Sequence, residues 1–209
     1  MGGTSAEREI SLISGRAVLA ALLDQNVDAF AFDPAEALIW TLAEHKPDRA
    51  FLILHGRQGE DGTVQAALEL MDIPYTGSGV MSSALAMDKL RTKMLWTAAG
   101  VPTPRWRVLA SIEDANAAAT DLGLPLVIKP AHEGSSIGVS IVHDAGDLPA
   151  AYAAAAQLDS LIIAEEFVAG MELTAGVLDD HVLPLVRYSP SGSREPRRLE
   201  RQLHSVATR

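Results

Sequence analysis

Several glycine-rich segments carry charged residues at positions where they could bind a ligand. The most specific is His55-Gly56-Arg57-Gln58-Gly59-Glu60-Asp61-Gly62, which follows the apolar run 50–54. Its glycines let the backbone approach a ligand closely, and ligands of open α/β sheets bind at the carboxyl ends of strands. Taken alone, the motif fits slightly better a turn in which backbone groups satisfy the His55 ring.

A second segment suits phosphate binding. Lys129-Pro130-Ala131-His132-Glu133-Gly134-Ser135-Ser136-Ile137-Gly138 places a lysine at the end of an apolar run and continues into a loop of glycine and serine. Backbone N–H groups and hydroxyls of such a loop can bind phosphate while the lysine neutralises its charge. No Gly-Lys-Ser/Thr sequence opens a helix here, so this is not a Walker loop. We expect a hairpin lid, and an ordinary hairpin turn is the alternative.

Two acidic segments are further candidates. Glu165-Glu166-Phe167-Val168-Ala169-Gly170-Met171-Glu172 ends an apolar run, and its carboxylates and backbone groups could pair with adenine or ribose. In Thr4-Ser5-Ala6-Glu7-Arg8-Glu9, the Glu7 carboxylate could bind a substrate ammonium group. Taken alone, the first segment fits an exposed strand end better, and the second fits a capping turn whose acids favour a helix N-terminus.

The apolar pattern of the first half predicts the elements that position these segments. Four residues at helical spacing predict one face of a helix that Thr4 or Ser5 caps: Ile10, Ile13, Ala17 and Ala20. A buried strand is expected at 50–54, a helix at 63–71, and one long helix at about 81–99 before Gly100. Helix and strand alternate here as they do in a parallel-sheet nucleotide-binding fold.

The second half has more predicted strands per residue. Strands are expected at 106–109, 126–129, 139–142 and 161–164, helices at 112–122 and 148–158, and a hairpin of 173–178 with 182–188 around Asp179-Asp180. This pattern predicts an α+β unit. We expect the boundary between the two halves near Met87.

Composition excludes several classes of function. The 209 residues carry a net charge of −10, contain no cysteine and are 48% apolar, which suits one large or two small folded domains. Disulfides and thiol chemistry are therefore absent. The acidic balance argues against nucleic acid or an anionic membrane as the main partner. The chain has neither a signal peptide nor a run of roughly 20 apolar residues, so we expect a cytoplasmic protein.

Together, the motifs resemble those of the D-alanine–D-alanine ligase family. The resemblance covers residues 1 to about 192 and follows the family's order and approximate spacing. The matching segments are residues 2–9, the His55 box continued to Ala66, residues 74–79, Met87-Asp88-Lys89 and residues 129–138. It implies an α/β protein with a Rossmann-like, D-alanine-binding domain at 1–87, a central ATP-grasp subdomain at 88–164, and the start of a C-terminal ATP-grasp subdomain at 165–209.

The resemblance also implies roles for individual residues. Glu7 would bind the ammonium group of the first D-alanine beside His55, and Ser135 would orient Glu7 and the substrates. Lys89 and Lys129 would contact the nucleotide phosphates. The loop 133–138, called the flap below, would close over these phosphates with Glu133, Gly134, Ser135 and Ser136. Adenine would meet Glu165, Glu166 and Val168, and the ribose would meet Glu172.

The implied reaction uses ATP and two molecules of D-alanine. ATP phosphorylates the carboxylate of the first D-alanine, and the amine of the second attacks the acyl phosphate to form the dipeptide for peptidoglycan synthesis and cell-wall biogenesis. Mg²⁺ would neutralise charge on the phosphates. The carboxylates that bind it in relatives have no counterpart in this sequence, so no metal ligand is predicted. The family also implies a homodimer built through the first domain.

The resemblance is incomplete at both ends. Relatives have a strand before the Gly-Gly-Thr-Ser turn, which begins here at Gly2, and they continue past Gly192 with further site residues. We expect the first strand to be missing, and we attribute the arginine-rich tail 193–209 to a frameshift. On this basis we predict negligible ligase activity for the 209-residue chain.

Three alternatives remain open from the sequence. An inactive fragment could bind nucleotide or D-alanine at most. A related ligase could use a different second substrate, such as D-lactate or D-serine. A purely structural interaction domain is the third reading, and the number of site motifs weighs against it.

Overall fold

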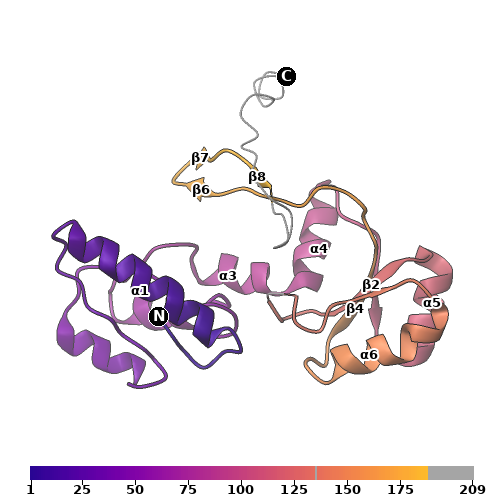
Figure 1. The fold of residues 1–209 in the computed structure, drawn as a ribbon, viewed down its shortest axis with the longest axis horizontal. Helices are drawn as coiled ribbons and strands as arrows, with labels where there is room; N and C mark the ends of the chain where they lie inside the picture. Colours follow the sequence, from indigo (N-terminus) through magenta and orange to yellow (C-terminus); the bar gives the residue numbers. More distant parts are fainter. Residues whose placement is uncertain (135, 188–209) are drawn as a thin grey trace. The chain divides into compact units, whose positions relative to one another are not determined.

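The computed structural model describes residues 1–134 and 136–187. It contains two compact units, Met1–Phe167 and Val168–Arg209 (Figure 1). Each unit is described separately below. Ser135 and the predicted tail 193–209 lie outside the described residues. None of the described helices is long and apolar enough to cross a membrane.

The N-terminal part of the first unit is built around three helices. They are α1 (Arg8–Asp24), the 3-10 helix η1 (Ile39–His45) and α2 (Thr63–Leu70). Its apolar core contains Leu42 of η1, Val64 and Leu68 of α2, and Ile73. The helix predicted at 63–71 is thereby confirmed. Gly62 precedes this helix with a φ of 90°, a left-handed conformation that glycine adopts without strain.

The prediction that the apolar face of α1 packs against the rest of the protein is wrong. Ile10 and Ile13 are 58% and 63% exposed, whereas Ser11 and Gly15 are buried. The Ser11 hydroxyl accepts a hydrogen bond from the N–H of Gly2 and donates one to the carbonyl oxygen of Ile53. A Cβ added to Gly15 would lie 2.4 Å from the Cβ of Met1. The packed face is therefore defined by small size and hydrogen bonding, which a hydrophobic pattern does not register.

The segment 50–54, predicted as a buried strand, does not form a regular strand. It forms one isolated parallel bridge, between Ala50 and Tyr75, and Phe51 is 53% exposed. Together with 27–32 it lines an open, largely apolar cavity of about 540 Å³. A strand is stabilised by a ladder of backbone hydrogen bonds to its neighbours. The described residues provide this segment with a single bridge instead of a ladder.

The long helix predicted at 81–99 is two helices, α3 (Val80–Met87) and α4 (Lys89–Ala98). The break lies at Asp88, whose φ of −87° and ψ of 100° are extended. The Asp88 carboxylate accepts the N–H of Arg91 at 2.9 Å and so caps α4. The backbone N–H of Lys89, the first residue of α4, has no acceptor within the helix and donates to the carbonyl oxygen of Ala131 at 3.0 Å. The first residues of α4 are therefore tied to the loop that leads into the flap.

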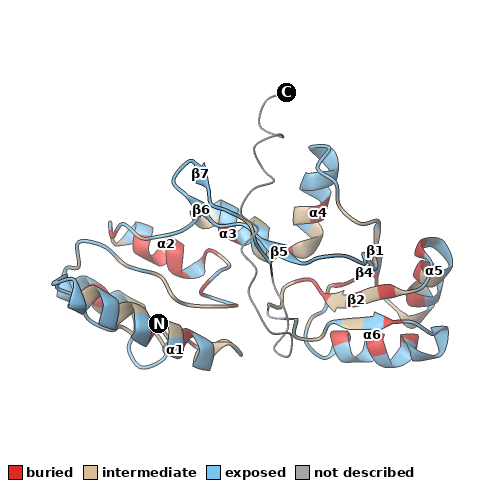
Figure 2. Ribbon diagram, turned by 45° about the horizontal axis from the view of Figure 1, so that its top comes forward, coloured by how far each residue is buried: buried red, intermediate tan, exposed pale blue. Residues whose placement is uncertain are grey.

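A four-stranded antiparallel sheet forms the core of the C-terminal part of the first unit, residues 106–166 (Figure 1). Its order is β1 (Trp106–Leu109), β4 (Ile162–Glu166), β2 (Leu126–Pro130) and β3 (Ser140–Val142). The helices α5 (Ile112–Leu122) and α6 (Leu148–Ala156) pack on it, and the short η2 (Ala145–Asp147) precedes α6. Figure 2 shows the buried residues of α5 and α6. The predicted strands and helices of this part are confirmed.

The described part of the second unit consists of short, exposed strands. β5 (Leu173–Thr174) pairs with β8 (Val186–Arg187), and β6 (Val177–Leu178) pairs with β7 (His181–Val182). The turn between β6 and β7 contains Asp179 with a φ of 51°. The hairpin predicted around Asp179-Asp180 is therefore confirmed, although its strands are shorter than expected.

Candidate functional site

Two glycines from separate loops approach the carboxylate of Glu7. An added Cβ would lie 2.6 Å from Glu7 Oε2 at Gly56 and 2.8 Å from the same atom at Gly134. Real Cβ atoms do not approach this closely, so neither position accepts a side chain without movement. The first glycine belongs to the His55 box and the second to the flap. The structure thus brings together three segments that the sequence singled out independently.

Hydrogen bonds hold the Glu7 turn against the His55 box. The hydroxyl of Ser5 accepts the N–H of Glu7 at 3.2 Å and donates to the carbonyl oxygen of His55 at 2.7 Å. The hydroxyl of Thr4 donates to the side-chain oxygen of Gln58 at 2.8 Å. Thr4 and Ser5 were predicted to cap α1, and Ser5 bonds instead to the residue just before that helix. These bonds fix the position of Glu7, the N-cap residue just before α1.

The His55 box has a defined internal structure. The Asp61 carboxylate accepts the N–H groups of Gln58 and Thr63 at 2.8 and 3.0 Å. Burial raises the pKa of Asp61, but these hydrogen bonds outweigh it and leave the pKa below its usual value. The carboxylate of Glu60 accepts the N–H of Gly56 at 3.0 Å and lies 3.4 Å from Nδ1 of His55. The carboxylates of Glu60 and Asp61 therefore hold the backbone of this loop in its conformation.

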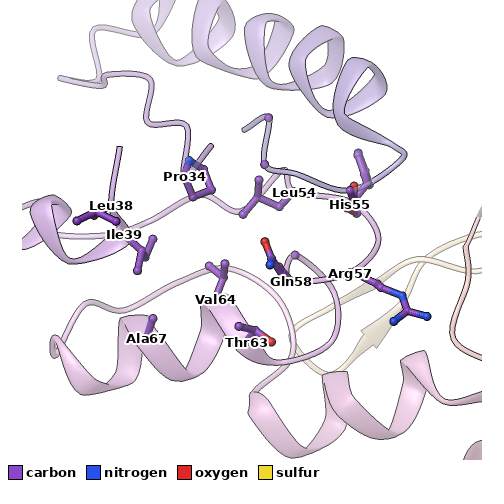
Figure 3. Close-up of a pocket in the computed structure, with 14 residues that line it drawn as sticks. Pro34, Leu38, Ile39, Leu54, His55, Arg57, Gln58, Thr63, Val64 and Ala67 are labelled. Atoms are coloured by element: carbon purple, nitrogen blue, oxygen red, sulfur yellow. Dashed lines mark hydrogen bonds between the residues drawn. The ribbon is translucent and has the colours of Figure 1, made fainter. Parts of the chain in front are cut away.

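A cavity of about 270 Å³ opens beside this box. Figure 3 shows His55 and Gln58 at one side and Leu38 and Ile39 at the other, while the Arg57 guanidinium extends away from these apolar side chains. The Nε2 atom of His55 is buried and has no hydrogen-bond partner among the described residues. Its hydrogen-bonding capacity is therefore unused among the residues that the structure describes.

The two predicted phosphate-binding lysines lie near the flap. The ammonium group of Lys89 donates to the carbonyl oxygen of Glu133 and lies 3.4 Å from that of Ala131. Burial lowers the pKa of Lys89, and nearby acids, of which Glu133 contributes most, oppose this effect. Burial, followed by the charges of Lys93 and Lys89, lowers the pKa of Lys129 to about 8. Both ammonium groups are thus partly desolvated, which strengthens their interaction with an anion.

The flap begins with an ion pair to the His55 box. Arg57 Nε donates to Glu133 Oε1 at 3.0 Å. Within the flap, Ile137 N–H donates to the carbonyl oxygen of Gly134 at 3.0 Å, and Ser136 has a φ of 61°. The candidate residue Ser135 is outside the described residues, so its role remains a prediction. Glu133, Gly134 and Ser136 do lie in one loop at this site.

Family models match two parts of the chain, one that contains the His55 box and one that contains the flap. The family model "D-ala D-ala ligase N-terminus" matches residues 42–78, and "D-ala D-ala ligase C-terminus" matches residues 95–193. A D-alanine–D-alanine ligase of Azoarcus sp. (strain BH72) is 62% identical over 193 residues, which cover 92% of this chain and 64% of that protein. A ligase of the same name from Nitrosomonas eutropha is 60% identical, with 90% and 61% covered.

Solved structures agree with the sequence comparisons. A D-alanine–D-alanine ligase from Bacillus anthracis has a TM-score of 0.79 and 37% identity, covering 90% of this chain and 62% of that one. The same enzyme complexed with ATP gives a TM-score of 0.79 at 35% identity, with 92% and 65% covered. The chain belongs to the D-alanine–D-alanine ligase family. It therefore has the ATP-grasp fold expected from its motifs, and it spans less than two thirds of the length of these relatives.

The residues predicted to meet adenine and ribose in this ligase-family chain are divided between the two units. Glu165 is 6% exposed, and its carboxylate pairs with Lys93 and Lys129. Glu166 pairs with Arg105, whose Nε donates to it at 2.7 Å. Val168 and Glu172 are exposed residues of the second unit. Their adenine and ribose contacts therefore remain predictions.

Sequence reasoning missed several ionic residues next to the site. Lys93 of α4 is 5% exposed and pairs with Glu165 at 2.7 Å. His132 lies between two carboxylates, with Nδ1 2.7 Å from Asp159 and Nε2 3.1 Å from Asp88. The position of Lys93, four residues after Lys89, places both on one helix face. That spacing was the available signal, whereas the partners of His132 come from distant parts of the chain.

Proposed function

We propose that this chain carries the amino-acid site and part of the ATP site of a D-alanine–D-alanine ligase, the family's ATP-dependent enzyme. The supporting observation is that one loop meets both candidate sites. Gly134 lies against the Glu7 carboxylate. The backbone carbonyl oxygen of the adjacent Glu133 accepts a hydrogen bond from the Lys89 ammonium group. A ligand bound at Glu7 and a phosphate bound at Lys89 would therefore share this loop.

The proposed roles follow from the chemistry of each group. The Glu7 carboxylate binds the ammonium group of the first D-alanine, so that the substrate carboxylate is directed to the nucleotide. Lys89 and Lys129 neutralise negative charge on the phosphates, with the flap backbone as an additional donor. The first step transfers the γ-phosphoryl group to the D-alanine carboxylate and releases ADP. In the second step, the amine of another D-alanine attacks the acyl carbon, and phosphate leaves with the bonding electron pair.

Positioning and water exclusion account for much of the expected rate. Two substrates held in contact react as one molecule, which removes a large entropic barrier. A closed flap would protect the acyl phosphate from hydrolysis. A Cβ at Gly56 or Gly134 would meet the Glu7 carboxylate, so these positions let two loops approach it closely. D-alanine as the first substrate rests on the family.

The metal requirement rests on the family alone. Among residues 1–134 and 136–187, no group of three or more histidine and acidic side chains is arranged to hold a metal ion. Use of Mg²⁺, formation of a homodimer, a cytoplasmic location and a role in peptidoglycan synthesis belong to the same proposal.

Calorimetric titration of the chain with ATP and with D-alanine tests the two sites separately. We expect both to bind, with Glu7→Gln abolishing D-alanine binding and Lys89→Met weakening ATP binding. Phosphate release with both substrates then distinguishes an active ligase from the second candidate, a chain that binds ligands without turnover. Absence of binding by a folded chain would refute the proposal.

A further inference from the structure

We propose that Lys93 is a positioning residue that keeps Glu165 neutralised, so that Lys129 can leave Glu165 and bind the phosphates of a nucleotide. This inference deepens the proposed ATP site and rests on it. It concerns a lysine that does not itself need to touch the nucleotide. Its basis is the unequal way in which two lysines share one buried carboxylate.

Lys93 is held firmly by three oxygen atoms. Its ammonium donates to the Thr103 hydroxyl at 2.7 Å and to the Pro104 carbonyl oxygen at 3.2 Å, and it pairs with Glu165 Oε2 at 2.7 Å. An ammonium group has three hydrogens, so these contacts use its full donor capacity. The side chain is only 7% exposed. Lys93 is therefore fixed in place and has no donor to spare for a ligand.

Lys129 meets the other oxygen of the same carboxylate. Its ammonium pairs with Glu165 Oε1 from the neighbouring strand β2. The Lys129 side chain is 22% exposed, about three times as much as that of Lys93. It also lies at the start of the loop that leads into the flap. Of the two lysines, Lys129 is the one that can change partners.

Electrostatics explains why both lysines are needed. A buried carboxylate that loses its only cation is strongly destabilised. If Lys129 moves to a phosphate, Glu165 retains Lys93 and stays compensated. Without Lys93, Lys129 would be the remaining partner of Glu165 and would be held there. Burial and the charge of Lys93 also lower the pKa of Lys129, which is consistent with a weakly held second cation.

The first test does not require a nucleotide. Amine acetylation of Lys129 is followed by mass spectrometry between pH 7 and 10 in the native chain, in Lys93→Met, and in Lys93→Arg, with Lys46→Met as an exposed control. We expect Lys93→Met to slow labelling of Lys129 near pH 8 by about fivefold, which corresponds to a pKa rise of about one unit from its value of about 8. Lys93→Arg and Lys46→Met should leave it nearly unchanged. Unchanged labelling in folded Lys93→Met would overturn the inference.

The second test compares binding of ATP with binding of adenosine. We expect Lys93→Met to weaken ATP binding by about tenfold while adenosine binding changes little. The double variant Lys93→Met/Glu165→Gln should bind ATP as tightly as Glu165→Gln alone, because Lys129 then has no carboxylate to leave. It also removes both members of the buried pair, so it remains informative if Lys93→Met fails to fold. Weaker ATP binding by the folded double variant than by Glu165→Gln would overturn the inference. If the native chain does not bind ATP, the proposed site fails, and the labelling result still decides the role of Lys93.

Discussion

Arg57 and Glu133 form an ion pair across 76 residues of sequence, with the Arg57 Nε 3.0 Å from the Glu133 Oε1. One residue belongs to the His55 box and the other begins the flap. The pair therefore connects the loop beside the proposed amino-acid site with the loop beside the proposed phosphates. Arg57 is half exposed and Glu133 is mostly buried, so water weakens the pair only in part.

Breaking this ion pair should loosen the flap without unfolding the chain. An exposed pair contributes up to about 1 kcal/mol, so we expect Arg57→Ala to speed amide hydrogen exchange in 133–138 by at most about fivefold. Arg16→Ala, an exposed arginine of α1, is the matched control. The charge-swapped double variant Arg57→Glu/Glu133→Arg should restore protection. Equal exchange in all variants would show that the pair does not restrain the flap.

Adding one methyl group at Gly134 should block the amino-acid site. The new Cβ would lie 2.8 Å from Glu7 Oε2, so either the carboxylate or the loop must shift. We expect Gly134→Ala to weaken D-alanine binding by about tenfold or more, with little loss of stability, because the atoms it displaces end the flexible Glu7 side chain. Gly170→Ala, where no atom lies within 4 Å of the added Cβ, is the control. Calorimetry provides the comparison, and undiminished D-alanine binding by Gly134→Ala would contradict the assignment.

The Asp159 carboxylate should make stability dependent on acid pH. Burial raises its pKa, but the N–H groups of Leu161 and His132 and the His132 ring lower it more, so the folded value lies below the usual one. Such a group stabilises the fold above its unfolded pKa of about 3.9 and loses that contribution as pH falls through the folded value. We expect Asp159→Asn to cost about 2 kcal/mol at neutral pH. Urea unfolding should show this difference shrinking below about pH 4.

The pH dependence of ATP binding should report on Lys129. Its pKa of about 8 means that the ammonium is lost as pH rises through that value in the free protein. We therefore expect ATP affinity to fall between about pH 8 and 10. Lys129→Met should bind ATP more weakly at neutral pH and show a flatter profile. A profile in Lys129→Met that still falls as steeply as that of the native chain would assign the dependence to another group.

Local patterns predicted the second half of the chain well. The helix α5 begins at Ile112 and ends at Leu122, the bounds predicted from the sequence. Ser111 and Asp114 form a capping box, whose sequence pattern is local. The strands β2 and β4 are short apolar runs buried in one sheet, and their shortness and β-branched residues are sufficient to predict them.

Tertiary contacts decided what the sequence could not reveal. Asp88 divides the predicted long helix because its carboxylate caps α4 and also meets His132. The packed face of α1 depends on the Ser11 hydrogen bonds and on space at Gly15. For the candidate site, the motifs located Glu7, His55 and the lysines. They did not reveal that Lys93 shares the Glu165 carboxylate, because that pair joins α4 to β4 across distant sequence.

The two glycines that border Glu7 have a consequence for how this corner could evolve. Its walls at Gly56 and Gly134 are main chain, so no side chain there can be shortened to enlarge the space, whereas an added side chain would narrow it. Enlarging this corner would therefore require a change in loop length or path. Substitutions that diversify the proposed amino-acid site are expected at residues farther from this carboxylate.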